Sequence, residues 1–178
     1  MKKIAKITGI VLSVIMALSC LMLPAQAASE SDLTITVDDD IAVVTNCKTT
    51  ASGVVDIPST YNGASVTRIR GSAFNACKNI TQINIPSTVK NIGSNAFEGC
   101  DMLEKVIFEQ GTTSVLPYVF ASFDRKIEIE IPDSVTGISS CAFTNCKWLT
   151  DLEIIPDTVT TISNDAFNGC TSLREIQL

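Results

Sequence analysis

The chain has 178 residues, of which 46% are hydrophobic, and its formal net charge is −6. This acidic balance argues against nucleic acid and anionic membrane surfaces as partners. The sequence contains no histidine, which excludes Ser-His-Asp and Cys-His catalysis and removes the commonest metal ligand. No pair of carboxylates is recognisably placed for acid–base chemistry, so we expect a protein that is not an enzyme and takes no cofactor or metal.

Residues 1–27 predict a secretory signal peptide. Lys2, Lys3 and Lys6 form a basic start, an apolar run extends from Ile10 to Leu23, and Ala25–Ala27 has the A-x-A pattern of a cleavage site. The apolar run is too short for a comfortable membrane span. Export is therefore expected, to the medium or to the cell surface.

Cleavage after Ala27 would leave one domain, residues 28–178, with a charge of −9 because three lysines are lost. Lipoprotein processing at Cys20 is an alternative, although the residues before it fit a lipobox poorly. No later apolar stretch reaches membrane length, so we expect no transmembrane span after signal removal.

Residues 28–53 predict a β-hairpin at the N-terminus of the domain. Apolar and polar residues alternate from Leu33 to Cys47 around Asp38–Asp40. The acidic triplet could supply carboxylate ligands for calcium, but it lacks the D-x-D-x-D-G spacing of a calcium loop, so a plain turn is the preferred interpretation.

Residues 54–178 contain about five repeats of a short cassette. It reads AFNAC at 73–77, AFEGC at 96–100, AFTNC at 142–146 and AFNGC at 166–170, with a degenerate VFASF at 119–123. The phenylalanines are 23, 23, 23 and 24 residues apart. A period in the twenties is typical of a solenoid, whose terminal units need a cap such as the predicted hairpin.

Each repeat combines a predicted strand with a predicted helical turn. In the second repeat, Ile80, Ile83 and Ile85 follow the pattern of a short inward-facing strand, and the next residue is a proline that ends it. After a further inward pair, Ala96 and Phe97 lie where one helical turn is expected. The fold class is therefore an α/β repeat solenoid with one short parallel strand and one short helical turn per repeat of about 23 residues.

The run I-x-x-I-x-I-P-x-x-V-x-x-I-x-x-x-A-F-x-x-C, residues 80–100, resembles the BspA-type leucine-rich repeat of bacterial surface proteins. The segment DIPSTYNGASVTRI, residues 56–69, is similar to the first repeat of that family, and the resemblance extends over about residues 54–178. It implies a leucine-rich repeat fold, export or surface display, and binding of an extracellular protein, with adhesion to host or neighbouring-cell proteins. It implies no catalytic residues.

Two features depart from the repeat pattern. The third repeat has Glu109 in place of proline, Phe123 in place of cysteine and Lys126 in place of an apolar residue, which predicts a local irregularity. The sequence given ends on a repeat strand at Leu178, and an open strand can pair with another chain. A structural module that self-associates through this C-terminal strand is therefore the alternative function.

The cysteines could form disulfides in an exported protein. However, the cassette position also accepts phenylalanine, at Phe123, and equivalent stacked positions point their Cβ atoms the same way, which suits a disulfide poorly. The states of Cys47 and Cys141, which lie outside this row, stay open. We predict buried free thiols at the cassette positions Cys77, Cys100, Cys146 and Cys170.

The outward face of the predicted strands is the candidate site. Side chains of a strand alternate between its faces, so the residues on either side of the central inward position point to solvent. The last three repeats place five carboxylates on this face, which predicts an acidic strip for a basic partner or a cation. The alternative is a solvated strand face relieved by Lys105, Lys126 and Arg174. The candidate residues are Gln82, Asn84, Lys105, Ile107, Glu128, Glu130, Asp151, Glu153, Glu175 and Gln177.

Overall fold

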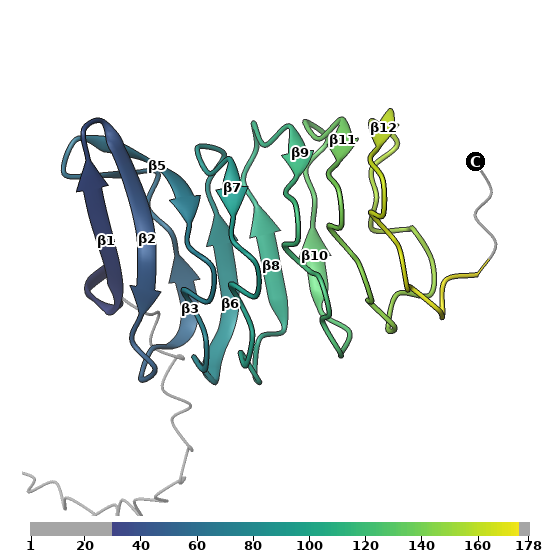
Figure 1. Ribbon diagram of the computed structural model, residues 1–178, viewed down its shortest axis with the longest axis horizontal. Helices are drawn as coiled ribbons and strands as arrows, with labels where there is room; N and C mark the ends of the chain where they lie inside the picture. The colour runs from purple at the N-terminus through teal and green to yellow at the C-terminus, as the bar shows by residue number, and fades with distance from the viewer. Residues whose placement is uncertain (1–29, 175–178) are drawn as a thin grey trace, which may run out of the picture.

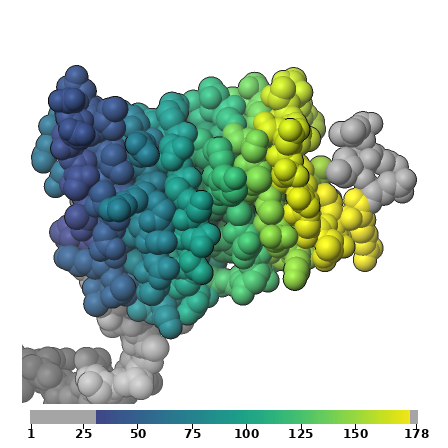
Figure 2. Space-filling view, in the orientation of Figure 1, coloured from purple at the N-terminus to yellow at the C-terminus, as the bar shows by residue number. Residues whose placement is uncertain are grey.

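The computed structural model describes residues 30–174, which form a two-layer β-solenoid (Figure 1). Successive units stack in chain order, as the bands of colour in Figure 2 show. The predicted signal peptide, the candidate residues Glu175 and Gln177, and most of the last predicted strand lie outside the described residues. A two-layer stack buries one core between its layers, and this core runs the length of the molecule.

The predicted N-terminal hairpin is confirmed. A 3-10 turn at Glu30–Asp32 leads into β1 (Leu33–Asp38), which pairs antiparallel with β2 (Ile41–Cys47). Asp39, at the tip, has a φ of 51°, a conformation that aspartate tolerates in tight turns. β2 then pairs in parallel with β5 (Ala64–Ile69), so the hairpin begins one layer of the solenoid.

The first layer is a parallel sheet with the order β10-β8-β6-β3. Ile83, Val106 and Ile129 are paired across it and are buried, as the alternation of the sequence predicts. Ile127 is also buried and fills the apolar place one residue after Lys126, which is exposed. The strands are β3 (Ser52–Asp56), β6 (Asn79–Ile85), β8 (Lys105–Phe108) and β10 (Glu128–Glu130).

The second layer consists of very short strands and turns. β5 pairs with β4 (Thr60–Tyr61) through a turn at Asn62 and Gly63, and it also pairs with β7 (Asn91–Ile92). β9 (Ser114–Val115), β11 (Gly137–Ile138) and β12 (Thr161–Ile162) form a separate three-stranded sheet. The second layer is thus divided between β7 and β9, whereas the first layer is continuous.

The expected helical turn is wrong: within residues 30–174 the cassettes form turns, and the chain has no α-helix. In every cassette the residues two before and two after the phenylalanine have positive φ. Left-handed residues interrupt the right-handed run that an α-helix needs. The pairs are Ser72 and Ala76, Asn95 and Gly99, Tyr118 and Ser122, Cys141 and Asn145, and Asp165 and Gly169.

The strand expected around Asp151 and Glu153 is also absent from the structure. The amide of Ile155 donates to the carbonyl of Leu152 at 2.8 Å and closes a turn there. This repeat has the 24-residue step, and its extra residue breaks the alternation that a strand requires. Asp151 and Glu153 are exposed, but they are not part of the first-layer sheet.

The core contains stacked rows of cassette side chains. The rings of Phe120 and Phe143 are 5.1 Å apart, and those of Phe143 and Phe167 are 5.3 Å apart and nearly parallel. The prediction of buried free thiols is confirmed for Cys77, Cys100, Cys146 and Cys170, whose thiols are unpaired and buried. Cys47 is likewise free and buried, and Cys141 is free and half-buried.

Candidate partner-binding face

The outer side of the first layer, which we call the strand face, presents two rows of side chains in register. Parallel pairing aligns equivalent residues of neighbouring units, so the rows cross β3, β6, β8 and β10. One row is Val54, Gln82, Lys105 and Glu128, and the other is Asp56, Asn84, Ile107 and Glu130. The structure therefore brings six of the ten predicted site residues together.

Lys105 lies between the two carboxylates of β10. Its Nζ is 2.9 Å from Oε1 of Glu128 and also forms an ion pair with Glu130. Hydrogen bonds to Glu128 and Glu130 raise the pKa of Lys105. The lysine side chain is only 25% exposed, whereas those of Glu128 and Glu130 are 65% and 50% exposed. Solvent and partners can therefore reach the carboxylates, and one positive charge offsets two negative ones.

A chain of side-chain hydrogen bonds orders the other half of the strand face. Nε2 of Gln82 donates to Oδ1 of Asn84 at 2.8 Å, and Nδ2 of Asn84 donates to Oδ1 of Asp56. Sequence reasoning missed Asp56. The signal was present, because Asp56 stands before Ile-Pro in the first repeat as Asn84 does in the second.

A shallow groove with a volume of about 410 Å³ lies at the end of these strands. Ile107 and Pro86 give it apolar walls, and Asp56, Asn84 and Glu109 give it polar ones. The carboxylate of Glu109 accepts a hydrogen bond from the amide of Ser87 at 3.1 Å. The residue that stands out in the sequence as a departure from proline therefore lines the groove.

The comparisons with known proteins agree with this geometry. A family model described as the BspA-type leucine-rich repeat region matches residues 55–174 in six copies. The chain belongs to the BspA-type leucine-rich repeat family. Among curated proteins, none matches it.

Solved structures of leucine-rich repeat proteins share the fold of this chain. A leucine-rich repeat protein of T. pallidum is 24% identical, with a TM-score of 0.65, and the alignment covers 86% of this chain and 72% of that one. A leucine-rich repeat protein from Bacteroides ovatus ATCC 8483 is 30% identical, with a TM-score of 0.55, and the alignment covers 83% of this chain and 40% of that one. This BspA-type chain thus spans less than half of the Bacteroides protein.

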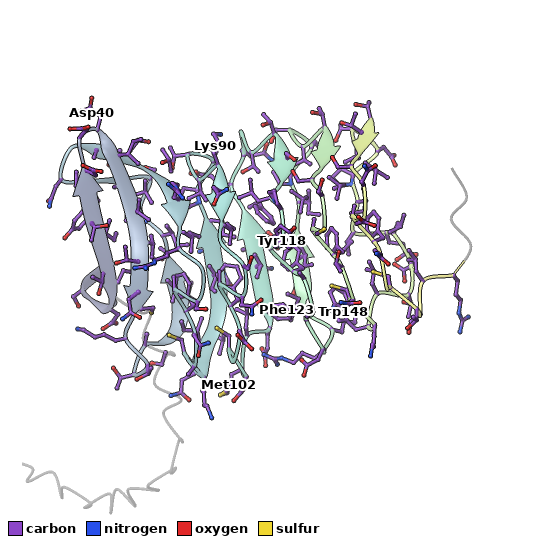
Figure 3. The ribbon with its side chains drawn as sticks, viewed as in Figure 1. Asp40, Lys90, Met102, Tyr118, Phe123 and Trp148 are labelled. Carbon is purple, nitrogen blue, oxygen red and sulfur yellow. The ribbon has the colours of Figure 1, made fainter. Side chains whose placement is uncertain are left out.

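The strip of five carboxylates expected on this BspA-type sheet is shorter in the structure. Of the five, Glu128 and Glu130 lie on the strand face, Asp151 and Glu153 lie in a turn beyond it, and Glu175 is outside the described residues. Over residues 30–174, no cluster of three histidine, cysteine, aspartate or glutamate side chains could hold a metal ion. Asp40 lies at the tip of the hairpin, at the edge of the molecule (Figure 3).

Proposed function

We propose that this chain is a protein-binding module that works outside a bacterial cell or on its surface, and that the strand face is its contact surface. Membership of the BspA-type leucine-rich repeat family supports a binding role. The observation on which the proposal depends is the strand face itself, where ordered polar side chains border a groove with apolar walls. In the described residues, no helix is long and apolar enough to cross a bilayer.

The chemistry of the strand face favours a partner with basic and apolar side chains. The carboxylates of Glu128 and Glu130 are exposed, and Asp56 and Glu109 flank the groove. Exposed charges steer association and are screened by salt. Ile107 offers an apolar contact between them. Adhesion to host or neighbouring-cell proteins would use such a surface.

Affinity capture with the chain lacking residues 1–27 tests this function. Extracellular matrix and bacterial envelope fractions serve as the two sources of partner. We expect Glu128→Gln combined with Glu130→Gln to weaken binding of the captured protein about threefold to tenfold at low salt, since each exposed pair contributes about 0.2–1 kcal/mol. The effect should shrink at high salt.

Asp157→Asn is the matched control for this experiment, because Asp157 is also exposed but lies outside the first-layer sheet. Its binding should equal that of the unchanged chain. Equal binding by the Glu128 and Glu130 variant would contradict the strand face as the contact surface, whatever partner is captured.

Self-association is the second candidate function, and one observation favours it. Ile162 in β12 is 50% exposed, and within the described residues β12 pairs on one side only, with β11. An exposed strand edge can pair with a second chain. Light scattering over a concentration series tests this: a constant monomer mass would rule out assembly through this edge.

A further inference from the structure

Stacking between units is interrupted at one junction, which we call the seam: the boundary between segments 89–100 and 112–123. At the neighbouring junctions, the amide four residues before the cassette phenylalanine donates to a carbonyl of the preceding unit. The amide of Leu116 makes no such bond to Ile92. The bonds at the other junctions are Arg70 to Val44 at 2.8 Å, Gly93 to Ile69 at 2.9 Å, Ser139 to Val115 at 2.9 Å and Ser163 to Ile138 at 2.9 Å.

The cassette turns show the same interruption. In the cassettes of Phe74, Phe120 and Phe143, the phenylalanine amide and the amide two residues later both donate to the next unit, as those of Phe74 and Ala76 do at 2.8 and 3.1 Å. At the seam the equivalent donors, Phe97 and Gly99, have no hydrogen-bond partner within residues 30–174. The acceptors they would use are the carbonyls of Val119 and Ala121.

The side-chain rows break at this place too. The rings of Phe74 and Phe97 are 5.4 Å apart, but Phe97 has no ring contact with Phe120 in the described part of the chain. The cassette thiols donate across the other junctions, as Cys100 does to the carbonyl of Phe74 at 3.3 Å. Phe123 has no thiol to donate. Within the described residues, the pairing of β6 with β8 in the first layer is the only strand ladder that connects the second and third units.

Larger side chains in the third unit explain the interruption. Phe123 replaces a cysteine, and Leu116 takes the place that Gly93 has in the second unit. A Cβ on Gly93 would lie 2.2 Å from the backbone nitrogen of Gly71, so a side chain at this position points at the preceding unit. Leu116 is buried, whereas the residues at the same position of the other units, Arg70, Ser139 and Ser163, are exposed or half-buried. Its side chain therefore occupies space between the second and third units and holds them apart.

A cavity of about 450 Å³ occupies the gap. Phe97 and Gly99 of the second unit and Val119 and Ala121 of the third unit are among the residues that line it. The second unit thus contributes lining residues whose amides are unpaired, and the third unit contributes lining residues whose carbonyls are unpaired, within residues 30–174. A peptide backbone offers both kinds of group along an extended segment, which is the basis of recognition by strand addition.

Charged and aromatic side chains surround the cavity mouth. Glu98, Asp101 and Asp124 are exposed carboxylates, and Arg125 is the one cationic side chain in the lining. Its Nη2 donates to the carbonyl of Cys100 at 2.8 Å, so it is already engaged with the wall. Tyr118 is 46% exposed and lies on the same part of the molecule as Phe123 (Figure 3). Carboxylates beside an aromatic ring suit a lysine or arginine side chain.

We propose that the seam binds a short extended peptide that carries basic side chains. The peptide backbone pairs with the free amides of Phe97 and Gly99 and with the free carbonyls of Val119 and Ala121, while its basic side chains lie against the carboxylates and Tyr118. This site is separate from the strand face, so its test is independent of the function proposed above.

Amide hydrogen exchange with a defined probe tests the proposal. In the free chain, we expect the amides of Phe97 and Gly99 to exchange at least tenfold faster than those of Phe74 and Ala76. The peptide acetyl-Ala-Lys-Ala-Lys-Ala-amide should slow both seam amides at least tenfold, and the same peptide with glutamate in place of lysine should not. Equal protection in the free chain, or no slowing by the basic peptide, would overturn the proposal.

Substitutions at the seam test whether the lysine peptide binds there. Leu116→Gly, Val119→Ala and Phe123→Cys together restore the side chains of the second unit and should close the seam, with at least a tenfold loss of affinity for the lysine peptide. Wild-type affinity in this folded variant would overturn the proposal. If the variant does not fold, the double variant Asp101→Asn and Asp124→Asn is the test. We expect its affinity for the lysine peptide to fall at least threefold, and unchanged affinity would refute the proposal. The Glu128→Gln and Glu130→Gln variant should bind the peptide normally.

Discussion

At the residue scale, the cassette cysteine acts as a buried hydrogen-bond donor between units. The thiol of Cys146 donates to the carbonyl of Phe120 at 2.9 Å, and that of Cys170 donates to Phe143 at 3.0 Å. Burial raises the pKa of both Cys100 and Cys146 to about 12. These thiols are therefore neutral at physiological pH and are poor nucleophiles, which fits a structural role.

The raised thiol pKa values predict instability in alkali. An unfolded thiol ionises near its ordinary pKa of 9.0, and the folded one only near 12. The free energy of unfolding is therefore fully retained below pH 9 and falls between pH 9 and 12, by about 1.4 kcal/mol per pH unit for each such thiol. Urea denaturation under reducing conditions should show a shallower fall for Cys146→Ala than for the unchanged chain. If the free energy of unfolding fell with pH at the same rate in both proteins, the Cys146 thiol would not be a source of the instability in alkali.

The ring stack predicts unequal effects of two alanine substitutions. Phe143 is fully buried between Phe120 and Phe167, so Phe143→Ala should lower the free energy of unfolding by about 3–5 kcal/mol. Phe167 is only partly buried at the end of the stack, so Phe167→Ala should cost less. Denaturant titration of both variants measures the difference, and an equal loss would argue against the stack as the source.

At the element scale, the cassette turn shows why the predicted helix does not form. Alanine and phenylalanine are compatible with a helix, and the hints of positive φ in the sequence are few, such as Asn95 and Gly99 in one cassette and Gly169 in another. Contacts between units contribute to this conformation: in the cassettes of Phe74, Phe120 and Phe143, the amides of the phenylalanine and of the residue two later donate to the next unit, while the amides between them donate within the turn. A pattern read within one repeat does not contain that information. The strands were predictable because their alternation is local.

Ala76 gives a test of the turn conformation. It has a φ of 61°, which disfavours residues with a Cβ by roughly 1–2 kcal/mol. Ala76→Gly should therefore raise the free energy of unfolding by about 1 kcal/mol in denaturant titration. The control is Ala96→Gly in the next cassette, where the alanine is buried and has no positive φ, and this change should be destabilising by about 1 kcal/mol. If both substitutions lowered the free energy of unfolding, this would contradict the positive φ of Ala76 in the turn.

At the scale of the whole molecule, the 23-residue period was enough to predict the solenoid, the order of its units and most of the strand face. Six candidate residues lie there because register follows from the period. The period did not predict the loss of Asp151 and Glu153 from the sheet, since one inserted residue changes the local pairing. The local irregularity expected in the third repeat is confirmed. The loss of contacts between the second and third units was not predictable, because it depends on Leu116 and on how neighbouring units pack.

The seam predicts weak coupling between the two parts of the stack. Stability of a solenoid is approximately a sum over units and their interfaces, so the weakest interface limits cooperativity. Native-state hydrogen exchange should show β11 and β12 opening separately from β5 and β7 at low urea. In the Leu116→Gly, Val119→Ala and Phe123→Cys variant, both groups should open together. Joint opening in the unchanged chain would contradict weak coupling at the seam.

The seam also bears on how this chain could be shortened. Residues 101–123 make up one full 23-residue period, and their removal would bring the cassette of residues 142–146 directly after that of residues 96–100. The carbonyl of Ala142 would then take the sequence position that Val119 now has, and without Leu116 between the units we expect it to accept a hydrogen bond from the amide of Phe97. The thiol of Cys146 would likewise face the carbonyl of Phe97. Removal of the third unit should therefore leave a shorter solenoid in which each cassette junction of the described residues has its amide and thiol bonds.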